Sequence, residues 1–164
     1  MNALFKKRTN LKSQFITFVH NTKMIISVTV NSESIANACD SYKKNNGRSI
    51  IYNGLDSVET PAYNCWNLSH LQEICNFICE NYSQCSQRES SGSYGLKHEI
   101  EESMFSYIAN GELILCAELL NIEQHIQSYE KDPNTDICMI KNSFDLLGKG
   151  PTYTFARRGD FGSY

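Results

Sequence analysis

The spacing of apolar and polar positions predicts two strands and a helix in the first third of the chain. Residues 24–31 are rich in β-branched side chains and alternate apolar with polar positions after Ile26, which is typical of a strand. Residues 33–44 repeat apolar positions at helical spacing, and Ser32 is the expected N-cap. A short strand is expected at 49–53, where an Asn-Gly pair predicts a turn.

The most regular helical stripe begins near the middle of the chain. Its apolar positions fall on one face of a helix, namely Leu68, Leu71, Ile74, Cys75, Ile78 and Tyr82. Ser69 and Gln72 have the spacing of a capping box at its start. Small and polar side chains then fill residues 83–93, so this segment is the best candidate for a linker between two lobes.

Two further helices and a strand are expected in the second half of the chain. Residues 96–104 predict a short helix with an acidic outer face. Residues 112–122 are apolar nearly all round, with Asn110 as the expected N-cap, so this helix should be buried. Residues 136–141 predict the last strand.

These elements predict a single α+β domain that is mostly helical and contains one small β-sheet, formed by residues 24–31, 49–53 and 136–141. A length of 164 residues fits one domain. We expect the core to include apolar residues from the two most regular helices: Leu71, Ile74, Ile78, Leu115, Leu119 and Leu120.

The composition excludes several classes of protein. Hydrophobic residues make up 41% of the chain and charged residues 20%, which excludes a disordered chain and supplies enough apolar material for a core. No run of 18 apolar residues occurs, so no membrane-spanning helix is expected. The seven cysteines are odd in number and no secretory signal is recognisable, so we expect reduced thiols and an intracellular location, cytoplasmic or nuclear.

Charge is distributed unevenly along the chain. Residues 1–32 carry five basic and no acidic side chains, a net charge of +5, whereas residues 91–150 carry ten acidic and four basic side chains, a net charge of −6. We therefore expect three parts: a basic arm at 1–23, a globular domain at 24–150 and a flexible basic and aromatic tail at 151–164. An acid-free segment is also typical of an organelle import signal, and Met24 is an alternative start.

Cysteine and histidine cluster once in the sequence, at Cys65, His70, Cys75, Cys79 and Cys85. Zinc sites typically use two close pairs of such residues. Here Cys75 and Cys79 would lie one turn apart on a helix, and no second close pair follows at zinc-finger spacing. Packing of the cysteines in the core is therefore the favoured interpretation, and zinc binding is the alternative.

A second metal hypothesis involves His98, Glu102 and His125. A metalloprotease helix carries two histidines one turn apart with a glutamate between them, and here the second position is Glu102. The expected ligand set is thus incomplete. We expect no bound metal and no cofactor.

The most distinctive stretch is Ser93-Tyr94-Gly95-Leu96-Lys97-His98-x-x-Glu101, followed by Tyr107-Ile108-x-Asn110-Gly111-Glu112-x-Ile114. It resembles blocks in small uncharacterised proteins of viruses and mobile elements, over residues 93–114 only, and the resemblance implies no activity. A DNA-reading helix-turn-helix is disfavoured because the second helix carries two glutamates and no lysine or arginine. The candidate interaction residues are Tyr94, Lys97, His98 and Glu101.

The function predicted from these features is that of a small, non-catalytic binding or regulatory protein, of the viral accessory kind, that acts through protein–protein contacts. We expect no catalytic residues. The alternative is binding of RNA or single-stranded DNA by the basic arm and the Arg-containing aromatic tail. Its contacts would be Lys6, Lys7, Arg8, Lys12, Arg157 and Arg158. A third hypothesis, an enzyme with a Cys–His or metal site, has no local signature.

Overall fold

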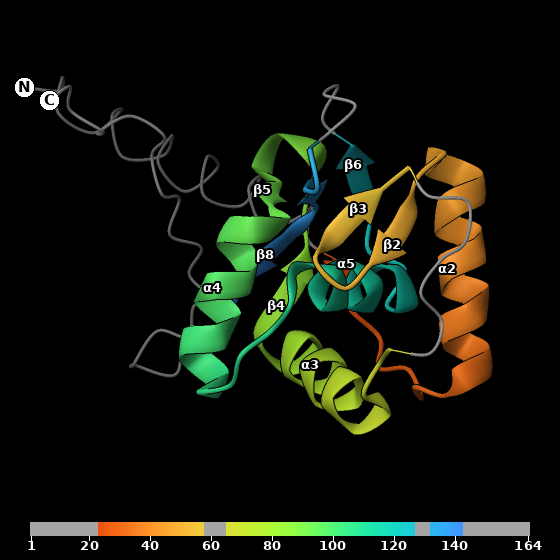
Figure 1. Cartoon of the computed structure of the whole chain (residues 1–164). Coiled ribbons are helices and arrows are strands. Elements are labelled where there is room, and N and C mark those ends of the chain that lie inside the picture. Colours follow the sequence, from red (N-terminus) through yellow and green to blue (C-terminus); the bar gives the residue numbers. More distant parts are fainter. Residues whose placement is uncertain (1–22, 58–64, 127–131, 143–164) are drawn as a thin grey trace, which may run out of the picture.

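The computed structural model describes residues 23–57, 65–126 and 132–142, and its fold is α+β and mostly helical, as predicted (Figure 1). The helices are α2 (Ser32–Asn46), α3 (Leu68–Asn81), α4 (Ser93–Met104) and α5 (Asn110–Leu119), with a 3-10 turn η1 (Gln87–Glu89). The strands are β1 (Lys23–Met24), β2 (Ser49–Ile51), β3 (Gly54–Asp56), β4 (Tyr82–Gln84), β5 (Ser91–Gly92), β6 (Gln124–Ile126), β7 (Thr135–Ile137) and β8 (Met139–Lys141). No helix in the described part of the chain is long and apolar enough to cross a membrane.

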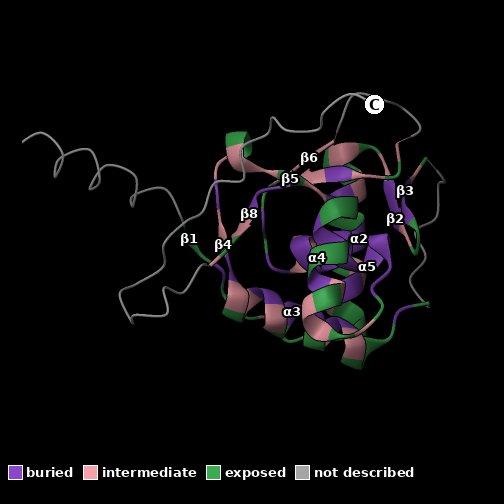
Figure 2. Cartoon of the chain, turned by 90° about the vertical axis from the view of Figure 1, so that its left-hand side faces the viewer, coloured by how far each residue is buried: buried purple, intermediate pink, exposed green. Residues whose placement is uncertain are grey.

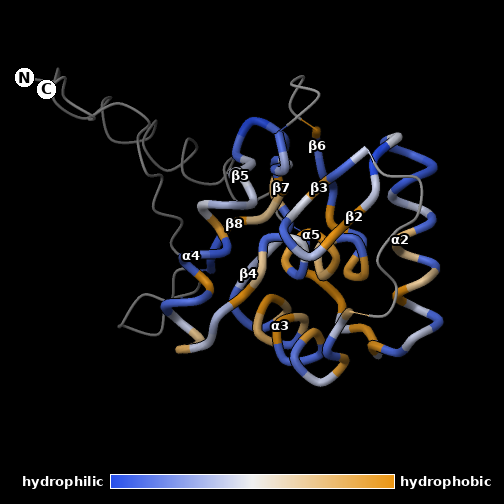
Figure 3. Tube along the Cα trace, in the orientation of Figure 1, coloured by the Kyte–Doolittle hydropathy of each residue, from blue (hydrophilic) through white to orange (hydrophobic). Residues whose placement is uncertain are grey.

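Helix α5 lies at the centre of the fold, with α2, α3 and α4 around it (Figure 1). It also contacts the β2–β3 hairpin. Residues 110–117 are all buried, so the prediction of a helix buried on every side is confirmed (Figure 2). Hydrophobic positions of the surrounding helices gather toward this centre, and hydrophilic positions of α2 and α4 face outward (Figure 3).

The described residues form three small antiparallel sheets, with strand orders β1-β4-β8, β2-β3 and β5-β7-β6. The single sheet predicted from residues 24–31, 49–53 and 136–141 is therefore wrong. Of the first segment only Met24 pairs with a neighbouring strand, together with Lys23, which precedes the segment. The reason lies in Gln72, whose side chain accepts a hydrogen bond from the Val30 N–H at 2.8 Å and donates to the Val28 carbonyl at 2.9 Å. The backbone of this segment is thus bound by a helix side chain.

The polar segment at 83–93 is built into the fold and does not form a loose connection. It contributes to β4, which pairs with both β1 and β8, and it contains η1 and β5. Ser83 and Gln84 are only partly exposed and Cys85 is buried. Small polar side chains occur in short strands as well as in loops, so composition alone did not distinguish the two.

Helices α2 and α3 begin one or two residues earlier than predicted because asparagine side chains cap them. Asn31 Oδ1 accepts from the Ser34 N–H at 2.8 Å, and Asn67 Oδ1 accepts from the His70 N–H at 3.2 Å. Ser32 and Ser69, the expected cap and capping-box residues, thus lie inside or at the start of α2 and α3.

Two glycines allow the β2–β3 hairpin to lie directly on neighbouring backbone. A Cβ atom on Gly111 would lie 1.8 Å from the carbonyl oxygen of Ile51, and the Gly111 N–H donates to the Tyr52 carbonyl at 3.0 Å. Gly54 has a φ of 132°, and a Cβ there would lie 2.3 Å from the carbonyl oxygen of Pro133. Neither position accepts a larger residue without moving the backbone.

All seven cysteines fall in the described residues, and each has a free thiol. Those with buried side chains are Cys39, Cys75, Cys85, Cys116 and Cys138. Packing in the hydrophobic core is confirmed for Cys39, Cys75 and Cys116. Cys79 is partly exposed and Cys65 is exposed.

The six predicted core residues allow a test of this arrangement. Five are buried, but Leu119, the last residue of α5, is only partly buried. Leu115→Ala should therefore lower the free energy of unfolding by about 2–5 kcal/mol, the usual loss for a fully buried leucine. The matched Leu119→Ala variant should lose less than half as much. Urea unfolding measures both, and equal losses would contradict the central position of Leu115.

Candidate functional site

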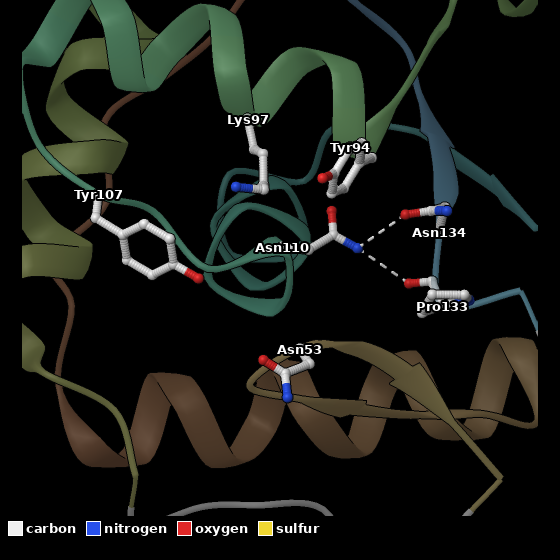
Figure 4. A pocket seen from close by; sticks show the side chains of 7 residues that line it. All are labelled: Asn53, Tyr94, Lys97, Tyr107, Asn110, Pro133 and Asn134. Carbon is white, nitrogen blue, oxygen red and sulfur yellow. Dashed lines mark hydrogen bonds between the residues drawn. The ribbon is translucent and has the colours of Figure 1, made fainter.

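A cavity of about 330 Å³ opens where the start of α4, the start of α5, the β2–β3 turn and the residues before β7 meet. Figure 4 shows Tyr94 and Lys97 reaching down from α4 toward Asn110, with Asn53 on the opposite side. We call this cavity the Lys97 pocket. Its lining residues are Asn53, Tyr94, Lys97, Tyr107, Asn110, Pro133 and Asn134.

Lys97 is the central charged group of the pocket and is only 5% exposed. Its ammonium donates to Glu101 Oε1 at 3.0 Å and to the Ile108 carbonyl at 3.3 Å. The ammonium nitrogen also lies 5.4 Å from the centre of the Tyr94 ring and 5.2 Å from that of Tyr107. A buried lysine needs such compensation, because removing its charge from water is costly.

Glu101 holds the base of the pocket by accepting three hydrogen bonds. Its Oε1 atom accepts from Lys97 and from the Ile108 N–H at 2.9 Å, and its Oε2 atom lies 2.7 Å from His98 Nδ1. Burial alone would raise the pKa of the Glu101 carboxyl, but the Ile108 N–H, Lys97 and His98 outweigh it and lower that pKa. Glu101 is therefore a carboxylate at neutral pH and joins α4 to the segment that precedes α5.

Asn110 brings an unsatisfied acceptor into the pocket. Its Nδ2 atom donates to the Pro133 carbonyl and to Asn134 Oδ1, both at 3.1 Å, which fixes the orientation of the amide. Asn110 is only 6% exposed, and its buried Oδ1 atom has no hydrogen-bond partner among the described residues. In Figure 4 this oxygen points toward the space between Lys97 and Tyr94. A buried acceptor without a donor is costly.

A chain of hydrogen bonds beside the pocket positions its Tyr107 wall. Ser106 Oγ lies 3.3 Å from His70 Nε2, and His70 Nδ1 lies 3.2 Å from Glu112 Oε1. The second oxygen of the buried Glu112 accepts from the Ala109 N–H at 2.8 Å. The order of these groups is that of a catalytic triad. However, the backbone N–H of Ser106 already donates to the Glu101 carbonyl at 3.4 Å, so this N–H is not available to stabilise an oxyanion. We therefore assign these hydrogen bonds a positioning role.

The structure brings together the four residues selected from the sequence. Tyr94 and His98 contact edge to face, with ring centres 4.7 Å apart, and Lys97 and His98 both bind Glu101. Their role in binding stays a prediction. The proposed nucleic-acid contacts, Lys6, Lys7, Arg8, Lys12, Arg157 and Arg158, lie outside the described residues.

The metal hypotheses from the sequence do not correspond to sites in the structure. His70 binds Glu112, and Cys75 interacts with the buried Cys116, so the first cluster is divided among different neighbours. Of the second set, His98 binds Glu101 and His125 lies beside Glu123.

Sequence reasoning missed the pocket residues contributed by other segments. Asn53 belongs to the Asn-Gly turn, Tyr107 to the distinctive block, and Asn134 to the turn before β7, so each carried a local signal. Nothing in those signals placed the three side chains around one lysine, because that arrangement depends on long-range packing.

The lowered pKa of Glu101 predicts a pH-dependent contribution to stability. Because the folded state holds this carboxyl below its ordinary pKa of 4.5, the contribution is complete above that value and is lost as pH falls through the folded pKa. Wild type should therefore be more stable than Glu101→Gln at pH 7, and the difference should shrink by about pH 3. Urea unfolding at both pH values measures this. The exposed neighbour Glu102, changed to Gln, is the control, and a constant difference for Glu101→Gln would contradict the assignment.

No protein-family model, no curated protein and no solved structure matches the chain. The resemblance of residues 93–114 to blocks in proteins of viruses and mobile elements stays a prediction.

Proposed function

We propose that the protein is a non-catalytic binding protein that recognises a protein partner through the Lys97 pocket, by taking up a carboxamide group of that partner. The group is the side chain of Asn or Gln, or a peptide unit of an extended segment. The observation that carries this proposal is the pairing, in one cavity, of a buried ammonium donor with the unsatisfied acceptor Asn110 Oδ1.

The hydrogen-bonding groups of the pocket complement an amide. An ammonium has three N–H donors, and among the described residues Lys97 uses two of them, on Glu101 and the Ile108 carbonyl. The third is left for an incoming acceptor. Asn110 Oδ1 requires an incoming donor. A carboxamide supplies both from one planar group, whereas a carboxylate or phosphate supplies acceptors only.

The rim of the pocket has the character of a protein interface. Tyr94, Tyr107 and Tyr52 expose large parts of their side chains, and Phe105 beside Tyr107 is almost fully exposed. Tyrosines are enriched in protein–protein interfaces because a rigid ring gives a large contact area at low entropic cost. Exposed rings around a polar cavity therefore favour a partner that covers the rim and inserts one polar group.

Charge around the pocket favours a protein over a nucleic acid. The exposed face of α4 carries Glu99 and Glu102, and the carboxylate of Glu101 already neutralises Lys97. A phosphate backbone would meet these acids within the range of electrostatic repulsion. Binding of RNA or single-stranded DNA by the arm and tail remains the alternative, and the test below distinguishes it.

The test uses a capped glutamine, N-acetyl-glutaminamide, titrated into the full chain and followed by the NMR signals of side-chain amides. The Asn110 side-chain signal should shift with millimolar affinity, and capped leucine at the same concentrations should leave it unchanged. Peptides selected from a random phage-displayed library on the full chain should contain Asn or Gln. They should bind Lys97→Met and Tyr107→Leu about tenfold more weakly or worse, a loss of about 1.4 kcal/mol.

Tyr107→Leu changes an exposed residue and keeps the proposal testable if Lys97→Met fails to fold. Lys141→Met, at an exposed lysine of β8, is the matched control and should bind the peptides as wild type does. Equal shifts of the Asn110 signal with capped leucine would contradict the proposal. So would selected peptides that bind both pocket variants, Lys97→Met and Tyr107→Leu, with the affinity of wild type. Tight binding of an oligo-dT strand, with the same affinity in wild type and in both pocket variants, would favour the nucleic-acid alternative.

A further inference from the structure

The ladder between β6 and β7 places four side chains of metal-binding type on one face. His125 pairs with Asp136 in the antiparallel register. One step along, the Cys138 N–H donates to the Glu123 carbonyl at 2.9 Å, so Glu123 lies opposite Cys138. Because side chains two residues apart on a strand share a face, Glu123 and His125 lie on the same side as their partners Cys138 and Asp136.

Three of these side chains converge to metal-binding distances. One ligand atom each from Glu123, His125 and Cys138 lies within 4.8 Å of the others. His125 Nε2 is 3.2 Å from Glu123 Oε1, yet this buried nitrogen makes no hydrogen bond within the described part of the chain. The nitrogen and the oxygen are therefore close to each other without the alignment of a hydrogen bond, as two ligands of a common centre are. A buried polar atom without a partner calls for a water or an ion.

We propose that Glu123, His125 and Cys138 bind a zinc ion, a combination of ligands that the sequence pattern did not predict. A thiolate, an imidazole and a carboxylate are the three ligand types that zinc uses in proteins, at about 2.0–2.3 Å. Two ligand atoms at such lengths in a tetrahedron are about 3.4 Å apart, which the separation of His125 Nε2 and Glu123 Oε1 approximates. The soft thiolate disfavours calcium and magnesium, which take oxygen ligands.

The burial of the three residues fits a bound ion at the edge of the fold. Cys138 is buried, His125 is partly exposed and Glu123 is exposed, so the site is open to solvent on one side and closed by the ladder on the other. Asp136, on the same face, adds a second carboxylate to the surroundings of the ion. The ion would fasten Glu123 and His125, which follow the central helix α5, to Cys138 between β7 and β8. The expectation of no bound metal is thereby replaced at this position.

The test is a titration of the purified, chelator-treated full chain with cobalt(II) and then zinc. Cobalt should produce a thiolate-to-metal absorption band at one equivalent per chain, and zinc should abolish it by displacement. Glu123→Gln and His125→Gln should weaken zinc binding about tenfold or more, and Cys138→Ser should abolish the thiolate band. Cys85→Ser, at the buried cysteine whose N–H donates to the Cys138 carbonyl, is the matched control and should bind as wild type does.

Glu123→Gln changes an exposed side chain, so its folding should equal that of wild type and its zinc affinity can be compared directly. Absence of a thiolate band in the folded wild-type chain would overturn the proposal. So would a band that persists in Cys138→Ser, which would place the metal on other cysteines, or zinc affinity unchanged in both Glu123→Gln and His125→Gln.

Discussion

The buried pair of Lys97 and Glu101 is the interaction around which the site is arranged. A lysine this deeply buried must have its charge compensated, and the pair alone does not satisfy all of its hydrogen-bonding groups. The backbone of Ile108 supplies the remaining hydrogen bonds of the pair: its carbonyl accepts from the Lys97 ammonium, and its N–H donates to the Glu101 carboxylate. One residue of the α4–α5 connection is thereby held at a fixed position beneath α4, and the course of the chain into α5 follows from it.

The position of α5 depends on this connection and on backbone contacts at its first turn. Glu112 accepts from the Ala109 N–H, and the Gly111 N–H reaches the hairpin carbonyl of Tyr52. A helix that is buried on all sides has no polar face to orient it, so its orientation must be set at its ends. The Lys97 pocket is the space left at that end between helix, hairpin and the turn before β7. Two of its lining residues also hold this end of the helix: Lys97 through the Ile108 carbonyl, and Asn110 through the Pro133 carbonyl and Asn134.

Local periodicity predicted the helices well, because the spacing of Leu71, Ile74 and Ile78 is a property of one segment. The same local spacing explains why Tyr94, Lys97, His98 and Glu101, selected from the distinctive block, lie together on one face of α4, and their role in binding stays a prediction. Pairing between distant segments could not be predicted. The strand expected at 24–31 is bound by Gln72, and the three-residue strands β3 and β6 are too short to show an alternation. The face formed by Glu123, His125 and Cys138 depends on a register between segments, which the sequence does not contain.

The burial and pairing of the Lys97 ammonium can be measured directly by the nitrogen-15 NMR signals of lysine side chains. Exposed lysine ammonium protons exchange rapidly with water, whereas those of a buried, hydrogen-bonded ammonium are protected. One protected lysine signal should be visible in the folded chain, should vanish in Lys97→Met, and should shift in Glu101→Gln and persist in Lys141→Met. A folded chain in which no lysine signal is protected would contradict the burial and pairing of Lys97 with Glu101, and with it the account of the pocket. A protected signal that has the same position in Glu101→Gln as in wild type would contradict it equally.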